Sequence, residues 1–299
     1  NLATYNSWIT YHTDLSTNYH LYLNTADSQQ NGQGNYFRDS AFTSEVFGVG
    51  DDVYGPNVSG TNMIAYCFTS KPGFSKVSYY TGNGSASGPM VQTGFEPAFL
   101  MTKRTDGGAY NWYMWDNKRS PSNPRDEVLQ ADTSNAEADY SAYPHDFYAN
   151  GFAVNTNNAA FNASGGNYIY LAFAADGSTA TPSLANSFAT EIYTGNGGTQ
   201  AITGTGFKPD FTWIKKRSGA QVHNLYDSVR GINKVLYSDL TNAQATVTSI
   251  SSFDTNGFTL ANGGGDTNAS GSTYVSWNWK AGGTPSINTD GTITSLVSA

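Results

Sequence analysis

Short stretches of alternating apolar and polar residues run through this chain, and the clearest of them occurs three times, at 62–68, 167–175 and 273–281. Side chains alternate between the two faces of a strand, so each copy gathers its apolar residues on one face. Those residues are Ile64, Tyr66 and Phe68, then Ile169, Leu171 and Phe173, then Val275, Trp277 and Trp279. The pattern predicts three equivalent strands, each with a core face and a lighter face.

Further strands are predicted between these segments. They cover 77–81, 98–103, 111–116, 126–130 and 151–155, with counterparts at 190–194, 211–216, 223–227, 233–237 and 257–261. Glycine- and asparagine-rich turns separate them, and helical periodicity is almost absent. Short helical turns are expected only around 132–140 and 239–245, where a capping residue precedes good helix formers. The chain is therefore predicted to be all-β, built from tandem antiparallel β-sandwich or jelly-roll-like modules.

The turn motifs recur at the spacing of a domain. Tyr-Thr-Gly-Asn-Gly occurs at 80–84 and 193–197, and Asn-Ala-Ser-Gly at 162–165 and 268–271. A repeat this long indicates tandem copies of an independently folded module and not a solenoid. The segment from Asn57 to Phe68 matches only the closing half of a copy, so we expect the chain to begin inside a module of a longer protein.

These repeats predict four units. They are a partial β-module at 1–75 whose opening half is missing, full β-modules at 76–180 and 186–283, and a hairpin-like tail or linker at 284–299. Linkers are expected at 69–76 and 176–189, and the tail contains a hairpin turn between Ile287 and Ile293.

Composition excludes several classes of protein. The net charge is −8, and the 15 Lys and Arg residues are scattered, so we expect no nucleic-acid binding. No apolar run approaches the length of a membrane-spanning helix, so membrane insertion is not expected. One cysteine, Cys67, cannot form an internal disulfide and is expected to be a small, semi-buried strand residue.

Reactive side chains do not recur between the modules. The four histidines, His12, His20, His145 and His223, form no column and no metal-ligand spacing, so we expect no metal, no cofactor and no enzyme. Asp116 and Asp227 do recur, each three residues before an arginine, Arg119 or Arg230. A structural ion pair is favoured over an acid/base pair at these positions.

Exposed aromatic residues could bind a glycan, because their ring faces stack on sugars. Trp277 and Trp279 share the apolar strand face, and Trp115 matches aromatic residues in the other copies, so these three are placed in a core or an interface. Candidate glycan-binding residues are Tyr110, Trp112 and Tyr113, beside the glycine pair at 107–108.

Three landmarks follow one another in each full copy: Tyr-Thr-Gly-Asn-Gly, then Gly-Phe-x-Pro-x-Phe leading to Lys103 or Lys215, then Asn-x-Ser-Gly before an apolar strand. Together they resemble the repeat modules of tail-fibre and other fibre-like virion proteins of tailed, often marine, bacteriophages. The resemblance covers about 1–283. It implies a virion structural protein, a tail fibre or capsid-decorating fibre, that projects β-modules for host attachment or particle decoration.

The same resemblance implies the surroundings of the protein. We expect a homotrimer at the virion surface, in contact with other virion proteins and with host surface glycans. Two alternatives remain open: a cell-surface adhesin or carbohydrate-binding β-sandwich array, and a polysaccharide depolymerase whose carboxylates would meet between subunits.

Overall fold

The computed structural model describes residues 2, 6–15, 18–32, 36–37, 42–43, 46–50, 55–174, 187–261, 264–281, 286–289 and 292–297. Its regular structure is nearly all antiparallel sheet, which confirms the all-β prediction. Among these residues the one helix is the short α1 (Ala159–Asn162). The helical turns expected at 132–140 and 239–245 are wrong. Asp132 and Asp239 instead accept hydrogen bonds from the backbone N–H groups of Trp112 and His223.

The second module is a sandwich of two sheets. The larger sheet has the order β4 (Ser75–Thr81), β12 (Asn167–Ala174), β6 (Pro97–Arg104), β7 (Tyr113–Asp116), β8 (Glu127–Gln130) and β9 (Ala138–Asp139). The smaller sheet has the order β10 (His145–Tyr148), β11 (Gly151–Val154) and β5 (Met90–Gln92). Between the sheets lies a core that includes Trp115, Phe152 and Phe161, all fully buried.

The third module repeats this architecture. Its larger sheet has the order β13 (Phe188–Thr194), β21 (Thr273–Trp279), β15 (Phe211–Lys216) and β16 (Asn224–Asp227). The other strands are β14 (Gln200–Thr203), β20 (Gly257–Leu260) and β19 (Ile250–Asp254), with a small ladder of β17 (Lys234–Val235) and β18 (Ala245–Thr246). The linker predicted at 176–189 lies almost entirely outside the described residues.

The two recurrent turn motifs are partners of each other. The Asn83 N–H donates to Asn162 Oδ1 (2.7 Å), and the Asn196 N–H donates to Asn268 Oδ1 (3.0 Å). The Asn162 amide also donates to backbone carbonyls of the loop that follows β4, including that of Ser85 (2.8 Å). Each motif therefore satisfies the buried polar groups of the other, which explains why both recur together.

Gly82 makes the closest approach in this pairing. Its N–H donates to the Gly166 carbonyl (2.8 Å), and a Cβ added at Gly82 would overlap the Ala163 carbonyl oxygen. We expect Gly82→Ala to lower the free energy of unfolding by about 1–3 kcal/mol, because two backbone segments would have to separate. Gly264→Ala is the control, since an added Cβ there meets nothing within 4 Å. Urea unfolding of both variants measures the difference, and equal effects would contradict this explanation.

Strand β12 is buried on both faces, which corrects the predicted contrast between a core face and a lighter face. The side with Tyr168, Tyr170 and Ala172 lines the core of its own module. The side with Ile169 and Phe173 faces away from that core, toward the other modules. The face predicted to be a module core is therefore the contact face between modules.

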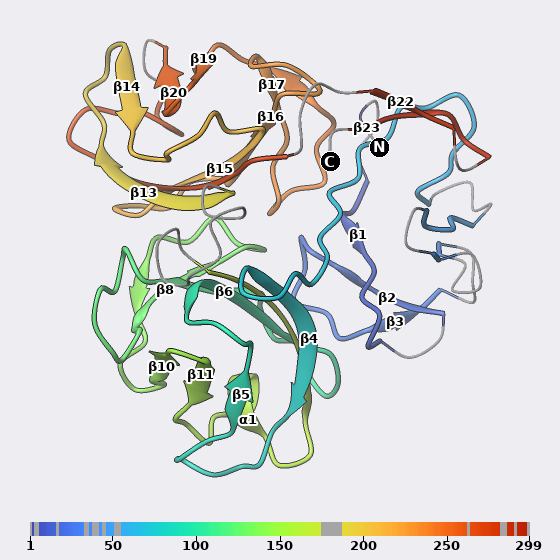
Figure 1. Cartoon of the computed structure of the whole chain (residues 1–299), viewed down its shortest axis with the longest axis vertical. Helices are drawn as coiled ribbons and strands as arrows, with labels where there is room; N and C mark the ends of the chain where they lie inside the picture. Colours follow the sequence, from blue (N-terminus) through green and yellow to red (C-terminus); the bar gives the residue numbers. More distant parts are fainter. Residues whose placement is uncertain are drawn as a thin grey trace.

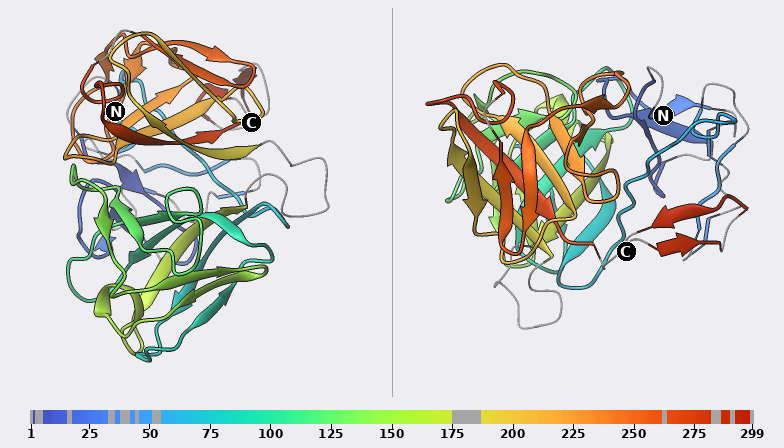
Figure 2. Two further views of the ribbon diagram at one scale, coloured as in Figure 1. Left: turned by 90° about the vertical axis from the view of Figure 1, so that its left-hand side faces the viewer. Right: turned by 90° about the horizontal axis from the view of Figure 1, so that it is seen from above.

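A shared core joins all three modules at these faces. It contains buried side chains from each module: Leu21, Ala98, Phe99, Met101, Trp112, Met114, Leu129, Ala131, Ile169, Phe173, Phe188, Phe211, Trp213, Leu225, Leu236, Val275, Trp277 and Trp279. Figure 1 shows the result: three bodies surround a common centre, and they do not form a row. The views in Figure 2 show the same grouping.

The first module retains part of the repeat. Strands β1 (Ile9–Thr10), β2 (Tyr19–Tyr22) and β3 (Gln30–Asn31) pair in that order, as β7, β8 and β9 do in the second module. The predicted strand at 62–68 is wrong, because these residues form no ladder with any described strand. Its equivalents, β12 and β21, pair with strands on both sides, and those strands belong to the opening half of the repeat.

The tail forms a two-stranded ladder of β22 (Ser286–Asn288) and β23 (Ser295–Val297), with Ile287 opposite Leu296. The second strand begins after Ile293, and Asp290 and Gly291 of the predicted turn lie outside the described residues. The hairpin lies on the same side of the molecule as the first module (Figure 2).

Candidate functional site

The three module junctions are built alike, and they close a ring. The Tyr110 N–H donates to the Ala26 carbonyl (2.8 Å) and links the second module to the first. The Gln221 N–H donates to Ser134 (2.7 Å), from the third module to the second. The Asn6 N–H donates to Thr241 (2.8 Å), from the first module to the third. The modules therefore have an internal pseudo-threefold arrangement.

In each module, the side chain two residues after this backbone donor also bonds across the junction, through a ring N–H. Trp112 Nε1 donates to the Tyr22 carbonyl (2.9 Å), and Trp8 Nε1 donates to the Tyr237 carbonyl (2.8 Å). His223 has the same place in the third module, where its Nε2 bonds the Gln130 carbonyl (2.9 Å). Its Nδ1 accepts from the Trp213 indole (2.8 Å), which fixes the proton on Nε2. Burial lowers the pKa of His223 well below its usual value.

A buried ion pair joins the second and third modules. Arg119 Nε donates to Asp116 Oδ2 (2.5 Å), and both side chains are fully buried. The same oxygen accepts from the Trp277 indole N–H of the third module (3.0 Å). Arg119 also reaches Glu137 (3.0 Å), which pairs across the junction with Arg217 (2.7 Å). Burial opposes the charge on Arg119, but Asp116 and Glu137 raise its pKa above the usual value.

The junction between the third and first modules repeats this pair. Arg230 Nε donates to Asp227 Oδ2 (2.5 Å), and that oxygen accepts from the Tyr66 hydroxyl (2.6 Å). Burial raises the pKa of Tyr66 well above its usual value. At the junction between the first and second modules, His12 has the place that Asp116 and Asp227 have at the other two, and it lies beside the backbone of Tyr170. The predicted ion pairs are confirmed, and they hold modules together.

Two equivalent lysines also cross the junctions. Lys103 Nζ donates to the Ala26 carbonyl (2.9 Å), and Lys215 Nζ donates to the Ser134 carbonyl (3.2 Å). Burial lowers the pKa of each ammonium group to about 8. Lys103 lies in β6 and Lys215 at the same place in β15.

The recurrent carboxylates are fully engaged in these junctions. Asp116 Oδ1 accepts from the backbone N–H groups of Lys118 (3.1 Å) and Arg119 (2.8 Å), while Oδ2 accepts from Arg119 and Trp277. In the described part of the chain, no group of three or more His, Cys, Asp or Glu residues could hold a metal ion. The described residues also contain no helix with the length and hydropathy that a membrane crossing requires.

The candidate glycan-binding residues lie in different environments. Trp112 is 5% exposed and packs in the shared core, and Tyr113 is 7% exposed and packs in the core of the second module. Tyr110 is half-buried, with the Arg104 guanidinium 4.9 Å above its ring. A sugar could therefore approach Tyr110, whereas Trp112 and Tyr113 offer it no open ring face. Glycan binding here stays a prediction.

Cys67 differs from expectation because it is exposed instead of semi-buried. Its equivalents Ala172 and Asn278 are fully buried. Ala172 lies in the core between the two sheets of the second module.

His145 gives the core of the second module a pH dependence. It stacks on Trp115 (ring centroids 4.2 Å apart) and is fully buried, so burial lowers its pKa to about 4. Between pH 6.5 and 4 the unfolded chain binds a proton that the folded chain does not, so the free energy of unfolding falls by up to about 3 kcal/mol.

We expect His145→Phe to remove this contribution, because phenylalanine keeps the stacking and does not titrate. Urea unfolding at pH 7.5 and 4.5 should show a smaller loss for the variant than for the unchanged protein. His223 remains in the variant and titrates in the same direction. Equal losses in both proteins would contradict the role assigned to His145.

The fold and the junctions define a class: an all-β protein of three repeated modules held in a ring by buried polar contacts and a common apolar core. The chain belongs to the family described as Domain of unknown function (DUF7483), whose model matches residues 1–176 and 183–299. No curated protein and no solved structure matches the chain.

Sequence reasoning missed the ring itself. The register of the repeats already aligned Trp8, Trp112 and His223, and it aligned His12 with Asp116 and Asp227. What it could not show is that each of these side chains bonds the neighbouring module, because contacts within and between modules leave the same pattern in a sequence.

Proposed function

We propose that this protein is a structural component of a bacteriophage virion, a tail fibre or a capsid-decorating fibre, and that it works by attachment and not by catalysis. The observation that carries the proposal is the use of the recurrent polar side chains. Asp116, Asp227, Lys103 and Lys215 all bond across or beside a module junction. Because the charged side chains that recur between the modules take part in contacts at the module junctions, the chain is suited to a rigid structural role.

The resemblance of the repeat landmarks to tail-fibre modules supports the virion setting. The ring supports a mechanical role, because three modules around one core form a compact block instead of a flexible chain. The loops around the ring would contact other virion proteins or host surface glycans. Association of such blocks as a homotrimer at the virion surface is part of this proposal, and sedimentation equilibrium of the purified protein tests it.

Immunogold labelling of purified particles tests the virion role directly. An antibody raised against residues 75–281 should decorate intact particles at a fixed position, either along the tail or over the capsid. Labelling confined to cell surfaces would instead favour the adhesin alternative. Release of reducing sugar from host capsule by the purified protein would favour the depolymerase alternative.

A further inference from the structure

The smaller sheet of the second module, made of β10, β11 and β5, exposes an aromatic ring on its outer face. We propose that this face, centred on Tyr148, binds a neutral pyranose sugar of a host surface glycan. The inference rests on the proposed attachment role and gives that role a binding site. The site is separate from the half-buried Tyr110, which lies before β7 of the larger sheet.

Alternation along the three strands defines the outer face. Phe147, Phe152 and Val91 point inward and pack in the core of the second module. The residues between them therefore point away from that core. The larger sheet, on the other side of this core, contacts the other modules. The smaller sheet is thus an outermost layer, and Figure 1 shows β5, β10 and β11 on the side of the second module away from the third.

Two large side chains dominate the outer face. Tyr148 is 44% exposed and Met90 is 49% exposed. The register places Gly151 opposite Tyr148 and Ala153 opposite both Asp146 and Met90. Gly151 and Ala153 are buried although they belong to the outer face, because larger neighbours lie over them. The result is an apolar surface that consists mainly of one ring and one thioether.

A hydrogen bond holds the ring in place. The Tyr148 hydroxyl donates to Asp146 Oδ2 (3.1 Å), and the same oxygen accepts from the Asn155 amide (2.7 Å). Asp146 lies two residues before Tyr148 on the same face, so this bond directs the ring along the sheet, with one ring face toward solvent. A side chain that is already held in one orientation loses little conformational freedom when a ligand stacks on it.

The polar groups beside the ring suit the hydroxyls of a neutral sugar. Asp146 Oδ1 and Asn155 Oδ1 form no hydrogen bond with the described residues, so both can accept one. Gln92 is exposed on β5, at the other edge of the sheet. The Asp146 carboxylate would repel an acidic sugar, because the nearby Arg125 is buried and paired with Glu96 (3.7 Å). An aromatic surface with a few polar groups beside it is the usual composition of a ligand site.

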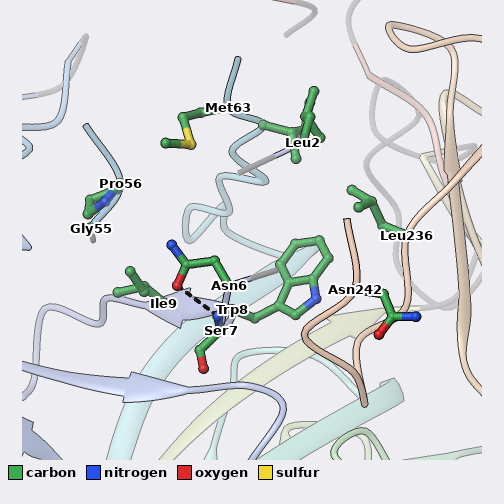
Figure 3. A pocket seen from close by; sticks show the side chains of 11 residues that line it. Leu2, Asn6, Ser7, Trp8, Ile9, Gly55, Pro56, Met63, Leu236 and Asn242 are labelled. Atoms are coloured by element: carbon green, nitrogen blue, oxygen red, sulfur yellow. Dashed lines mark hydrogen bonds between the residues drawn. The ribbon is translucent and has the colours of Figure 1, made fainter. Parts of the chain in front are cut away.

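The cavity at the junction between the first and third modules does not suit such a ligand (Figure 3). Its volume is about 80 Å³, whereas ordinary ligand pockets have about 300 Å³ or more. Trp8 and Ile64 line it from the first module, and Leu236 lines it from the third. The Trp8 indole is already bonded to the Tyr237 carbonyl (2.8 Å). The cavity therefore belongs to the junction.

The third module has the same sheet without the aromatic surface. In the register of β19, β20 and β14, Asp254 has the place of Tyr148 and Ala201 has the place of Met90. Asp254 accepts a hydrogen bond from the Thr259 hydroxyl (2.6 Å) and offers no ring. We therefore expect the second module to bind the sugar and the third module not to bind it.

An array of immobilised neutral and acidic glycans tests the proposal, with the protein displayed on beads so that weak contacts add. We expect binding to neutral glycans, and Tyr148→Ala should reduce it by about tenfold or more, because the stacking surface is lost. Tyr148→Phe should reduce it less, since the ring remains and the bond to Asp146 is lost. Tyr79→Ala is the matched control and should leave binding unchanged, because Tyr79 is 55% exposed on the edge strand β4 of the same module.

Three results would overturn the proposal. The first is the absence of binding to neutral glycans, or equal binding by the unchanged protein and the Tyr148→Ala variant. The second is a loss of binding in Tyr110→Ala and not in Tyr148→Ala, which would place the sugar at Tyr110. The third is dissociation of an oligomer by Tyr148→Ala in sedimentation equilibrium, which would identify the face as an interface between copies of the chain.

Particle labelling separates this inference from the proposed function. Labelled particles together with no glycan binding would contradict the sugar site and leave the virion role intact. Glycan binding that depends on Tyr148, together with unlabelled particles, would support the sugar site and contradict the virion role.

Discussion

Replacing Asp116 by alanine is expected to lower the free energy of unfolding by about 3–5 kcal/mol, which is the effect of breaking a buried ion pair. The variant leaves the Arg119 guanidinium fully buried without its 2.5 Å partner. It also removes the acceptor of the Trp277 indole, which belongs to the neighbouring module. The loss therefore weakens the junction as well as the second module, and urea unfolding measures it.

Two further variants separate charge burial from simple loss of a carboxylate. Asp27→Ala removes an exposed aspartate and should change stability by less than about 0.5 kcal/mol. Asp116→Ala combined with Arg119→Leu should recover part of the lost stability, because no unpaired charge then remains buried. The first module has Leu15 three residues after His12, so a leucine is already tolerated there. An Asp116→Ala effect no larger than that of Asp27→Ala would contradict the role of the pair.

Replacing Trp277 by alanine is the second large change, and we expect a loss of about 3–5 kcal/mol from the cavity it leaves. Trp277 is fully buried in the shared core, where its ring centroid lies 5.7 Å from that of Phe99 and 6.0 Å from that of Trp213. Phe99 belongs to the second module and Trp213 to the third. The loss should therefore destabilise both modules, although the substitution lies in only one.

Amide hydrogen exchange under native conditions tests this spread. Protection should fall by similar factors in β6 of the second module and β15 of the third, because both strands contribute to the shared core. Trp277→Phe is the matched control and should cost less in both strands, since most of the ring volume is kept. A loss of protection in β15 with none in β6 would show that the modules are energetically independent.

The strands of the full modules could be predicted because the alternation of apolar and polar residues within each segment is enough to identify a strand. The segment at 211–216 is β15, and 167–175 matches β12 within a residue. The segment at 62–68 has the same pattern, but among the described residues no strand lies on either side of it to pair with it. A periodic pattern predicts which face is apolar, but not whether a second strand is there to pair.

The candidate site was less accessible to sequence reasoning for a related reason. An apolar strand face has the same sequence pattern whether it packs inside its own module or against the neighbouring one. Trp112 looked unconstrained because the third module has His223 in its place, yet both rings donate to a neighbouring carbonyl. Chemically different side chains can share one role when each presents an N–H at the same point. A comparison of residue types between the repeats does not detect a position that is shared in this way.

If the modules form one unit around a shared core, they should stay together when the connection between the second and third modules is cleaved. A protease recognition sequence is inserted within 176–186, the protein is cut in native buffer, and the products are separated by size-exclusion chromatography. We predict that the two fragments elute together at the position of the intact chain, held by the core around Trp277 and by the Glu137–Arg217 ion pair. Elution as two separate folded fragments would contradict the claim.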